Sequence, residues 1–336
     1  MRQFSFACML GYACVMAVPA YAWTHSEISV VAGLQNFVID SGVDSGEVKI
    51  LTDKTTHAIQ FVNGKPHLVP ADAPSSPVAP PNILPHAAVT QGERNIAAAW
   101  LATATDRYNH GVLGDEIGAA TAATRLQNGD VLRYDLPADS VFEDLTPRLY
   151  DIDGDGDDEI IVVRSNLYDG AAVSVLTVGA RGLEVFAEAY PIGLTHRWIS
   201  PLDAAEFDGD GVMEVAAMVA PHLQGVPSFY NREGQRLKRF AAAPGFSTHY
   251  IDSSILGMSV ILDAHSDGRP GIVLPSLDRD TLYTVGFDDP SKLKIIETVH
   301  HDSEIMTAIA ATDIDRQGGA DIMYGLDSGA IILIRR

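Results

Sequence analysis

Alternating carboxylates stand out in the segment 151-DIDGDGDDEIIVV-163. Acidic residues at alternate positions let a tight turn point their side chains inward, and the two glycines permit the backbone angles of that turn. Flexible, oxygen-rich loops of this kind suit Ca²⁺, which takes roughly 6–8 oxygen ligands. The expected ligands are the side chains of Asp151, Asp153, Asp155 and Glu159, together with the carbonyl of Asp157.

Related segments recur along the chain. They are 206-EFDGDGVMEVAAM-218, 263-DAHSDGRPGIVLP-275, 313-DIDRQGGADIMYG-325 and a fainter copy, 106-DRYNHGVLGDEIG-118. The second copy predicts ligands at Glu206, Asp208, Asp210, the carbonyl of Val212, and Glu214; the 313 copy predicts them at Asp313, Asp315, Gln317 and Asp321. The 263 copy has lost carboxylates, and the 106 copy is expected to be a turn without metal. The alternative for every copy is a turn in which Asp side chains accept hydrogen bonds from neighbouring amides.

An EF-hand is excluded by the residues that follow the glycines. Its loop needs a Glu six residues after the glycine and a helix on either side. Val162 and Ala217 stand at that position here, and the sequence that follows has the β-branched character of a strand.

The elements that must position these loops are strands. The copies start 45, 55, 57 and 50 residues apart, which is the period of a four-stranded propeller blade. We expect an all-β chain with six or seven blades and DxDGDG-type calcium loops. Strand signals at 47-EVKILT-52 and in the hairpin 57-HAIQFVNGKPHLV-69 favour N-terminal strands, within 23–69, that complete the last blade. A Pro-rich loop over 70–90 precedes the repeated blades of 91–336.

The first 22 residues have the features of a secretory signal. Arg2 is followed by an apolar stretch and by the small-x-small pattern that ends at Ala22. We expect cleavage there, a periplasmic or extracellular protein, and no membrane insertion afterwards. Both cysteines lie inside this segment, so the exported chain must gain its rigidity from a large core or from bound metal. The formal net charge of −21 argues against binding to nucleic acid or anionic membranes.

The repeated loops resemble those of the FG-GAP/VCBS family, the integrin-α-like β-propellers whose blades carry D-x-D-x-D-G-x-x-D calcium loops. The resemblance covers about 95–336 and is most specific at the 151 and 206 copies. Glu replaces Asp at several ligand positions, and no Phe-Gly or Gly-Ala-Pro signature is found. The resemblance implies a calcium-stiffened scaffold that binds a protein or a glycan.

Catalysis is the less favoured alternative. Carboxylates repeated about every fifty residues are explained by metal binding, and the nucleophile-elbow, HExxH, P-loop and dinucleotide motifs are missing from the sequence. A polysaccharide hydrolase or lyase stays open, as does an assembly factor. Two similar segments, 195-THRWIS-200 and 248-THYIDSS-254, predict a ligand face that contains His196, Arg197, Trp198 and His249. The alternative for these four is packing between blades.

Overall fold

The computed structural model describes residues 24–40, 47–74, 77–263, 268–289 and 291–335. This part of the chain is all-β: it contains 25 strands, one short 3₁₀ helix, η1 (Gly111–Leu113), and no α-helix. None of its helices has the length and apolar character needed to cross a membrane. The expected signal segment, residues 1–22, lies outside the described residues. The all-β class predicted from the strand signals is confirmed.

Twenty-four of the described strands fall into six sets of four, each set pairing antiparallel in a fixed order. Three sets are β2 (Leu34–Asp40), β3 (Glu47–Thr52), β4 (Thr56–Val62), β5 (Lys65–Pro70); β6 (Thr90–Gln91), β7 (Ile96–Thr105), β8 (Gly118–Leu126), β9 (Val131–Asp135); and β11 (Arg148–Tyr150), β12 (Glu159–Asn166), β13 (Gly170–Gly179), β14 (Gly182–Ala189). The others are β15 (Ile199–Ala205), β16 (Glu214–Val219), β17 (Val226–Glu233), β18 (Arg236–Ala242); β19 (Val260–Asp263), β20 (Pro270–Pro275), β21 (Thr281–Asp289), β22 (Lys292–His300); and β23 (Ala310–Thr312), β24 (Asp321–Gly325), β25 (Ala330–Arg335), β1 (Thr24–Val30).

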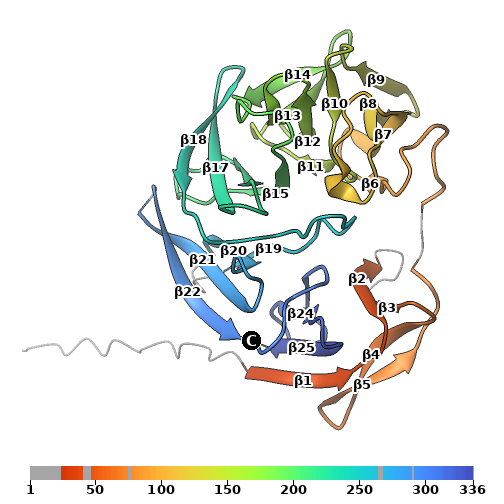
Figure 1. The fold of residues 1–336 in the computed structure, drawn as a ribbon, viewed down its shortest axis with the longest axis vertical. Helices are drawn as coiled ribbons and strands as arrows, with labels where there is room; N and C mark the ends of the chain where they lie inside the picture. The colour runs from red at the N-terminus through yellow and green to blue at the C-terminus, as the bar shows by residue number, and fades with distance from the viewer. Residues whose placement is uncertain (1–23, 41–46, 75–76, 264–267, 290, 336) are drawn as a thin grey trace, which may run out of the picture.

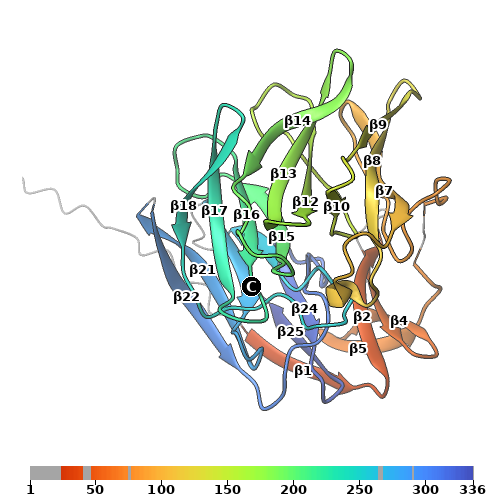
Figure 2. The ribbon, with the colours of Figure 1, turned by 45° about the horizontal axis from the view of Figure 1, so that its top comes forward.

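The sets follow one another around a common centre, as Figures 1 and 2 show. Two links join three neighbouring sets into one 13-stranded sheet: β10 (Ser140–Phe142) pairs with both β8 and β12, and β14 runs parallel to β18 over two residues. The other three sets are separate four-stranded sheets.

Burial differs between the strands of a set, and the sequence explains why. The second strand is covered on both faces, so it reads as a continuous apolar run such as Ile160–Val163 in β12. The fourth strand is partly solvated: β22 contains only exposed and half-buried residues, and β9 alternates between the two. The inner strands therefore form the core, and the outer strands carry the polar surface.

The strand that completes the last set is β1, which pairs antiparallel with β25 from Thr24–Arg335 to Val30–Ala330. We expected N-terminal strands within 23–69 to do this, and β1 lies in that range; the strands at 47–69, whose sequence favoured the expectation, are not the ones that pair with β25. The predicted strand at 47–52 is β3 and the predicted hairpin is β4–β5, but with β2 they form a set of their own. Of the five N-terminal strands, β1 to β5, only β1 pairs with β25.

Local turn chemistry matched expectation in the β4–β5 hairpin. Asn63 and Gly64 both have positive φ, 52° and 74°, as a two-residue turn of type I′ requires. Residues 115–124 include the start of strand β8, which runs from Gly118 onward. Its run of Ala and Thr is buried between β7 and β9, so tertiary packing overrides helix propensity there.

Removing β1 should destabilise the whole ring of sheets. A chain that starts at Val31 exposes the edge of β25, whose residues 330–334 are all buried. We expect the free energy of unfolding to fall on the order of 3 kcal/mol or more, with self-association through the open edge. Thermal unfolding and light scattering test this against a control chain that starts at residue 23. Equal melting temperatures for the two chains would contradict the structural role of β1.

Candidate functional site

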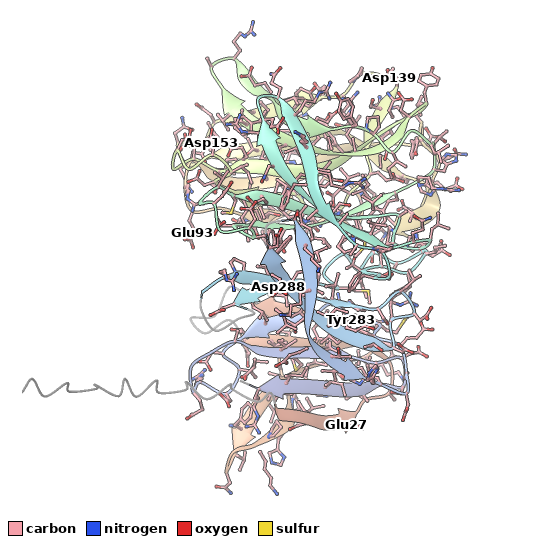
Figure 3. The ribbon with its side chains drawn as sticks, turned by 90° about the vertical axis from the view of Figure 1, so that its left-hand side faces the viewer. Glu27, Glu93, Asp139, Asp153, Tyr283 and Asp288 are labelled. Atoms are coloured by element: carbon pink, nitrogen blue, oxygen red, sulfur yellow. The ribbon has the colours of Figure 1, made fainter. Side chains whose placement is uncertain are left out.

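Three of the acidic loops occupy the same place in their sets. The 151, 206 and 313 loops each connect the first strand of a set to the second: β11 to β12, β15 to β16, and β23 to β24. Glu93, in the corresponding connection between β6 and β7, lies on the same side of the molecule as Asp153 in Figure 3. The faint 106 copy differs, because it connects the second strand, β7, to the third, β8, and includes η1. It is therefore not an equivalent loop.

Each of these three loops gathers carboxylate oxygens within 4.8 Å of one another. The groups are Asp151, Asp153 and Glu159; Glu206, Asp208, Asp210 and Glu214; and Asp313, Asp315 and Asp321. The first group leaves out Asp155, whose Oδ1 accepts a hydrogen bond from the N–H of Asp157 at 2.8 Å. The carbonyls of Asp157 and Val212 and the side chain of Gln317 stay predictions. Such clusters can hold a metal ion through oxygen ligands alone.

One hydrogen bond recurs in all three loops. The carboxylate at the start of the second strand accepts from the backbone N–H of the residue after the first acidic position: Glu159 from Ile152 at 2.9 Å, Glu214 from Phe207 at 2.6 Å, and Asp321 from Ile314 at 3.0 Å. Ile152 and Phe207 are buried, and Ile314 packs on an apolar cluster. The apolar residue between two acids therefore anchors the loop, and the strand carboxylate closes it.

The backbone of the three loops is also equivalent. The fourth position has positive φ in each, at Gly154 (75°), Gly209 (86°) and Arg316 (60°). Arg316 adopts a left-handed conformation that glycine adopts without cost. The shared geometry explains how the 313 loop reproduces the cluster although it lacks the DGDG sequence.

Two buried carboxylate oxygens have no hydrogen-bond partner within the described part of the chain. They are Oδ1 of Asp151 and Oε1 of Glu214, and each belongs to one of the clusters. A buried, unsatisfied anionic oxygen is costly unless a proton or a cation compensates it. The donor set is entirely oxygen, so these residues fit a hard divalent cation.

The clusters shift the pKa values of their closing carboxylates upward. Burial, followed by the nearby charges of the same loop, raises the pKa of Glu159 and of Glu214 to about 7 and that of Asp321 to about 6. Arg232 lies 3.7 Å from Asp153 and Arg335 lies 3.7 Å from Asp315, so partial compensation comes from neighbouring strands. Without a cation, the crowded carboxylates favour protonation.

The 263 loop is only partly described, so its weaker metal binding stays a prediction. Residues 264–267, including His265 and Asp267, lie outside the described residues. Asp263 Oδ2 accepts from the N–H of Gly268 at 3.2 Å, which is the counterpart of the 3.0 Å bond from Gly156 to Asp151. This hydrogen bond is therefore present although Gly271 stands in place of the closing acid.

The predicted ligand face lies at the opposite ends of the strands. His196 and Arg197 are exposed and Trp198 is buried, and all three line a cavity of about 340 Å³. His249 is fully buried; its ring centroid lies 4.6 Å from that of Trp198. The packing alternative therefore holds for His249 and Trp198, whose rings contact each other, while His196 and Arg197 face the cavity.

Sequence reasoning missed three neighbours of this cavity: Tyr108, His110 and Glu143. His110 Nδ1 lies 2.5 Å from Oε1 of Glu143, which is buried. Burial raises the pKa of Glu143, while the hydrogen bond from His110 opposes that rise. His110 falls in the loop between β7 and β8, and the recurrence of His in the loops of this face is the one sequence signal that could have found it.

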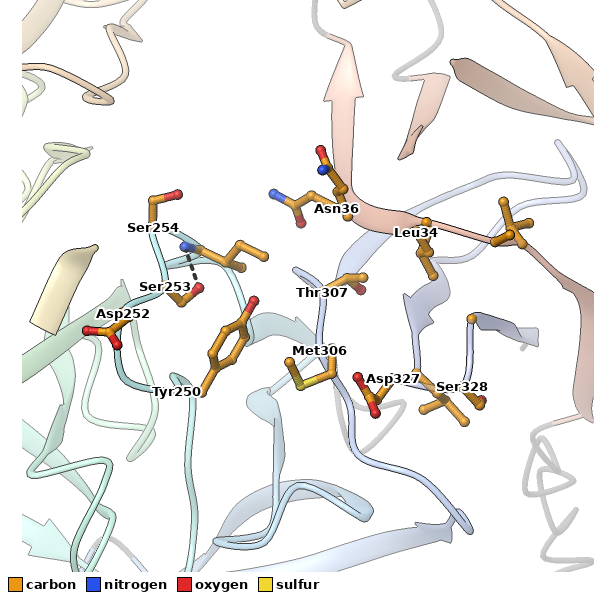
Figure 4. Close-up of a pocket in the computed structure, with 17 residues that line it drawn as sticks. Leu34, Asn36, Tyr250, Asp252, Ser253, Ser254, Met306, Thr307, Asp327 and Ser328 are labelled. Atoms are coloured by element: carbon orange, nitrogen blue, oxygen red, sulfur yellow. Dashed lines mark hydrogen bonds between the residues drawn. The ribbon is translucent and has the colours of Figure 1, made fainter. Parts of the chain in front are cut away.

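A larger hollow, about 590 Å³, lies on the same face between other loops (Figure 4). Its lining includes Asn36 in β2, Tyr250 before β19, and Thr307 before β23. The side chains come from separate segments around the hollow, and the N–H of Ile255 donates to Ser253 Oγ at 3.0 Å. Neither hollow is formed by the acidic loops.

A scan against protein-family models and a search of curated proteins gave no match to this chain.

The raised pKa values predict how stability depends on pH in the presence of a chelator. Glu159 and Glu214 titrate near 7 in the folded, metal-free chain and near 4.3 when unfolded, so the folded state holds more protons between these values. Stability should therefore fall as pH rises from about 5 to about 7. Melting temperatures in EDTA measure this, with Glu159→Gln plus Glu214→Gln as the control that loses most of the fall. A melting temperature that rises over this window would contradict it.

Proposed function

We propose that this chain is an exported, calcium-stabilised β-propeller of the FG-GAP/VCBS kind, with six blades, that acts as a scaffold for binding a protein or a glycan. The observation that carries the proposal is the recurrence of one carboxylate cluster at the same connection in three sets of strands. The six antiparallel sets, with β1 completing the last, support a blade number of six.

Calcium is favoured over other metals by the donor set. All the clustered ligands are carboxylates, and neither His nor Cys belongs to any of the three clusters. Zinc and copper prefer nitrogen and sulfur ligands, whereas calcium accepts flexible all-oxygen sites with variable geometry. Three calcium ions per chain would set six positive charges against the ten clustered carboxylates.

Export is supported by the sequence of residues 1–22. An extracellular or periplasmic setting also supplies calcium at concentrations that weak loop sites require, since extracellular modules bind it in roughly the 10⁻⁴–10⁻³ M range.

The binding role is supported by the face opposite the acidic loops. The loops of this face connect second to third strands or one set to the next, and their exposed apolar side chains include Tyr168, Leu194, Leu223 and Ile251. Leu223 and Ile251 also line the cavity of about 340 Å³, and exposed apolar groups beside a cavity are typical of a recognition surface.

A polysaccharide hydrolase or lyase is the second candidate, and the contact between His110 and Glu143 favours it. A carboxylate that holds an imidazole is an arrangement used in acid–base catalysis. Release of reducing ends from envelope or plant polysaccharides, lost in His110→Gln, would support the enzyme. The absence of turnover on such a panel would favour the scaffold.

Calcium should raise the melting temperature of the chelated protein. Each site that is saturated at 100 times its Kd contributes about 2.7 kcal/mol to the free energy of unfolding. Asp153→Ala plus Asp208→Ala should remove most of this effect, since each changes one clustered carboxylate.

The matched control is Asp157→Asn, because only the carbonyl of Asp157 is expected to bind and its side chain is exposed. Its calcium response should equal that of the parent chain. An unaltered calcium titration in the double Ala variant would refute the assignment of these loops as calcium sites.

A further inference from the structure

The cavity of about 340 Å³ lies at the edge of the sheets opposite the acidic loops. In an antiparallel set, the connection from the first to the second strand lies at one edge, and the next connection lies at the other. The cavity is lined from loops at that other edge. Two of them connect a second to a third strand, β7 to β8 and β16 to β17, and two connect one set to the next, β14 to β15 and β18 to β19. Any ligand there is therefore separate from the proposed metal loops.

Backbone strain concentrates at this cavity. Three residues that line it, His196, Ala220 and Asp252, have φ values of 54°, 49° and 67°. Left-handed conformations cost on the order of 1–3 kcal/mol for such residues and cluster at ligand sites. The N–H of His196 donates to the hydroxyl of Tyr108 at 2.7 Å, and that of Ala220 donates to the carbonyl of Trp198 at 3.0 Å. These bonds hold the strained loops in place.

A chain of hydrogen bonds sets the protonation of His222. His249 Nε2 lies 2.8 Å from the carbonyl of Ser253, which only accepts, so Nε2 carries the proton. Burial lowers the pKa of His249 to about 3 and that of His222 to about 4, so both rings are neutral at pH 7. His249 Nδ1 then accepts from His222 Nε2 at 2.8 Å. Nδ1 of His222, on a ring that lines the cavity, is therefore a hydrogen-bond acceptor.

The cavity combines this acceptor with a cation and an apolar surface. Arg197 is exposed, and its guanidinium has five N–H donors, one of which bonds the carbonyl of His196 at 3.2 Å. Leu223 and Ile251 are exposed apolar side chains in the lining. Asp252 is the one acidic residue among the lining residues, in a chain whose net charge is −21. An anion is therefore attracted by local groups and not by the overall field.

We propose that this cavity binds an acidic sugar residue, a uronate within a glycan. Its carboxylate matches the planar fork of Arg197, a hydroxyl donates to His222 Nδ1, and the C–H face of the ring covers Leu223 and Ile251. A fatty acid lacks the hydroxyl, inorganic phosphate lacks the apolar face, and a neutral sugar lacks the carboxylate. The inference rests on the proposed glycan-binding function and names its ligand class and site.

The test is a calorimetric titration of the full exported chain with two disaccharides. One ends in glucuronate, and the other has glucose in the same position. Because uronates bind calcium themselves, free calcium is removed by dialysis first. The glucuronate sugar should bind at least tenfold more tightly. Arg197→Gln should remove that preference, and His222→Phe, which keeps an aromatic ring beside Trp198, should weaken both sugars.

Arg133→Gln is the matched control, since Arg133 is exposed on β9 and does not line the cavity. It should bind as the parent chain does. Equal affinity for the two sugars, no binding of either, or an Arg197→Gln variant that retains the preference would each overturn the proposal. Calcium-dependent melting is measured without any sugar. It therefore tests the calcium scaffold separately from the binding of a sugar in this cavity.

Discussion

The edge of the sheets that holds the acidic loops depends on one feature, a buried carboxylate at the start of the second strand of a set. Glu214 is fully buried, yet it lies within 4.8 Å of three further carboxylates, and Glu159 and Asp321 have similar surroundings. Burying such groups is unfavourable unless protons or a cation offset their repulsion. The hydrogen bond from the backbone to each closing carboxylate fixes its place, so the loops cannot relieve the repulsion by turning that side chain outward.

The two edges of the sheets therefore have different chemistry. One edge holds oxygen clusters on short loops anchored by buried residues such as Ile152 and Phe207. The other edge holds longer connections with histidines, exposed apolar side chains and strained backbone around two hollows. Strands common to both edges link them mechanically: the 206 loop begins where β15 ends, and Trp198 immediately precedes that strand. Rigidity supplied at the first edge thus supports the geometry of the second.

The sequence predicted the all-β class and the carboxylate clusters because both depend on local patterns: an apolar run after each loop, and acids at alternate positions. It did not predict that β1 pairs with β25, because several N-terminal segments have equal strand character and only tertiary packing selects among them. His110 and Glu143 were missed for a similar reason. They are 33 residues apart and meet through the pairing of β8 with β10, which no local pattern reveals. The 313 cluster survives despite Arg316, since backbone conformation and not residue identity sets the loop.

The central claim is that the three carboxylate clusters hold metal ions in the folded chain. Native mass spectrometry of a chain that starts at residue 23, in calcium, counts these ions directly. The account predicts three calcium ions per chain, and two when Glu214→Gln removes the buried carboxylate of the 206 loop. A chain that carries no calcium, or the same number in the parent and the variant, would contradict it.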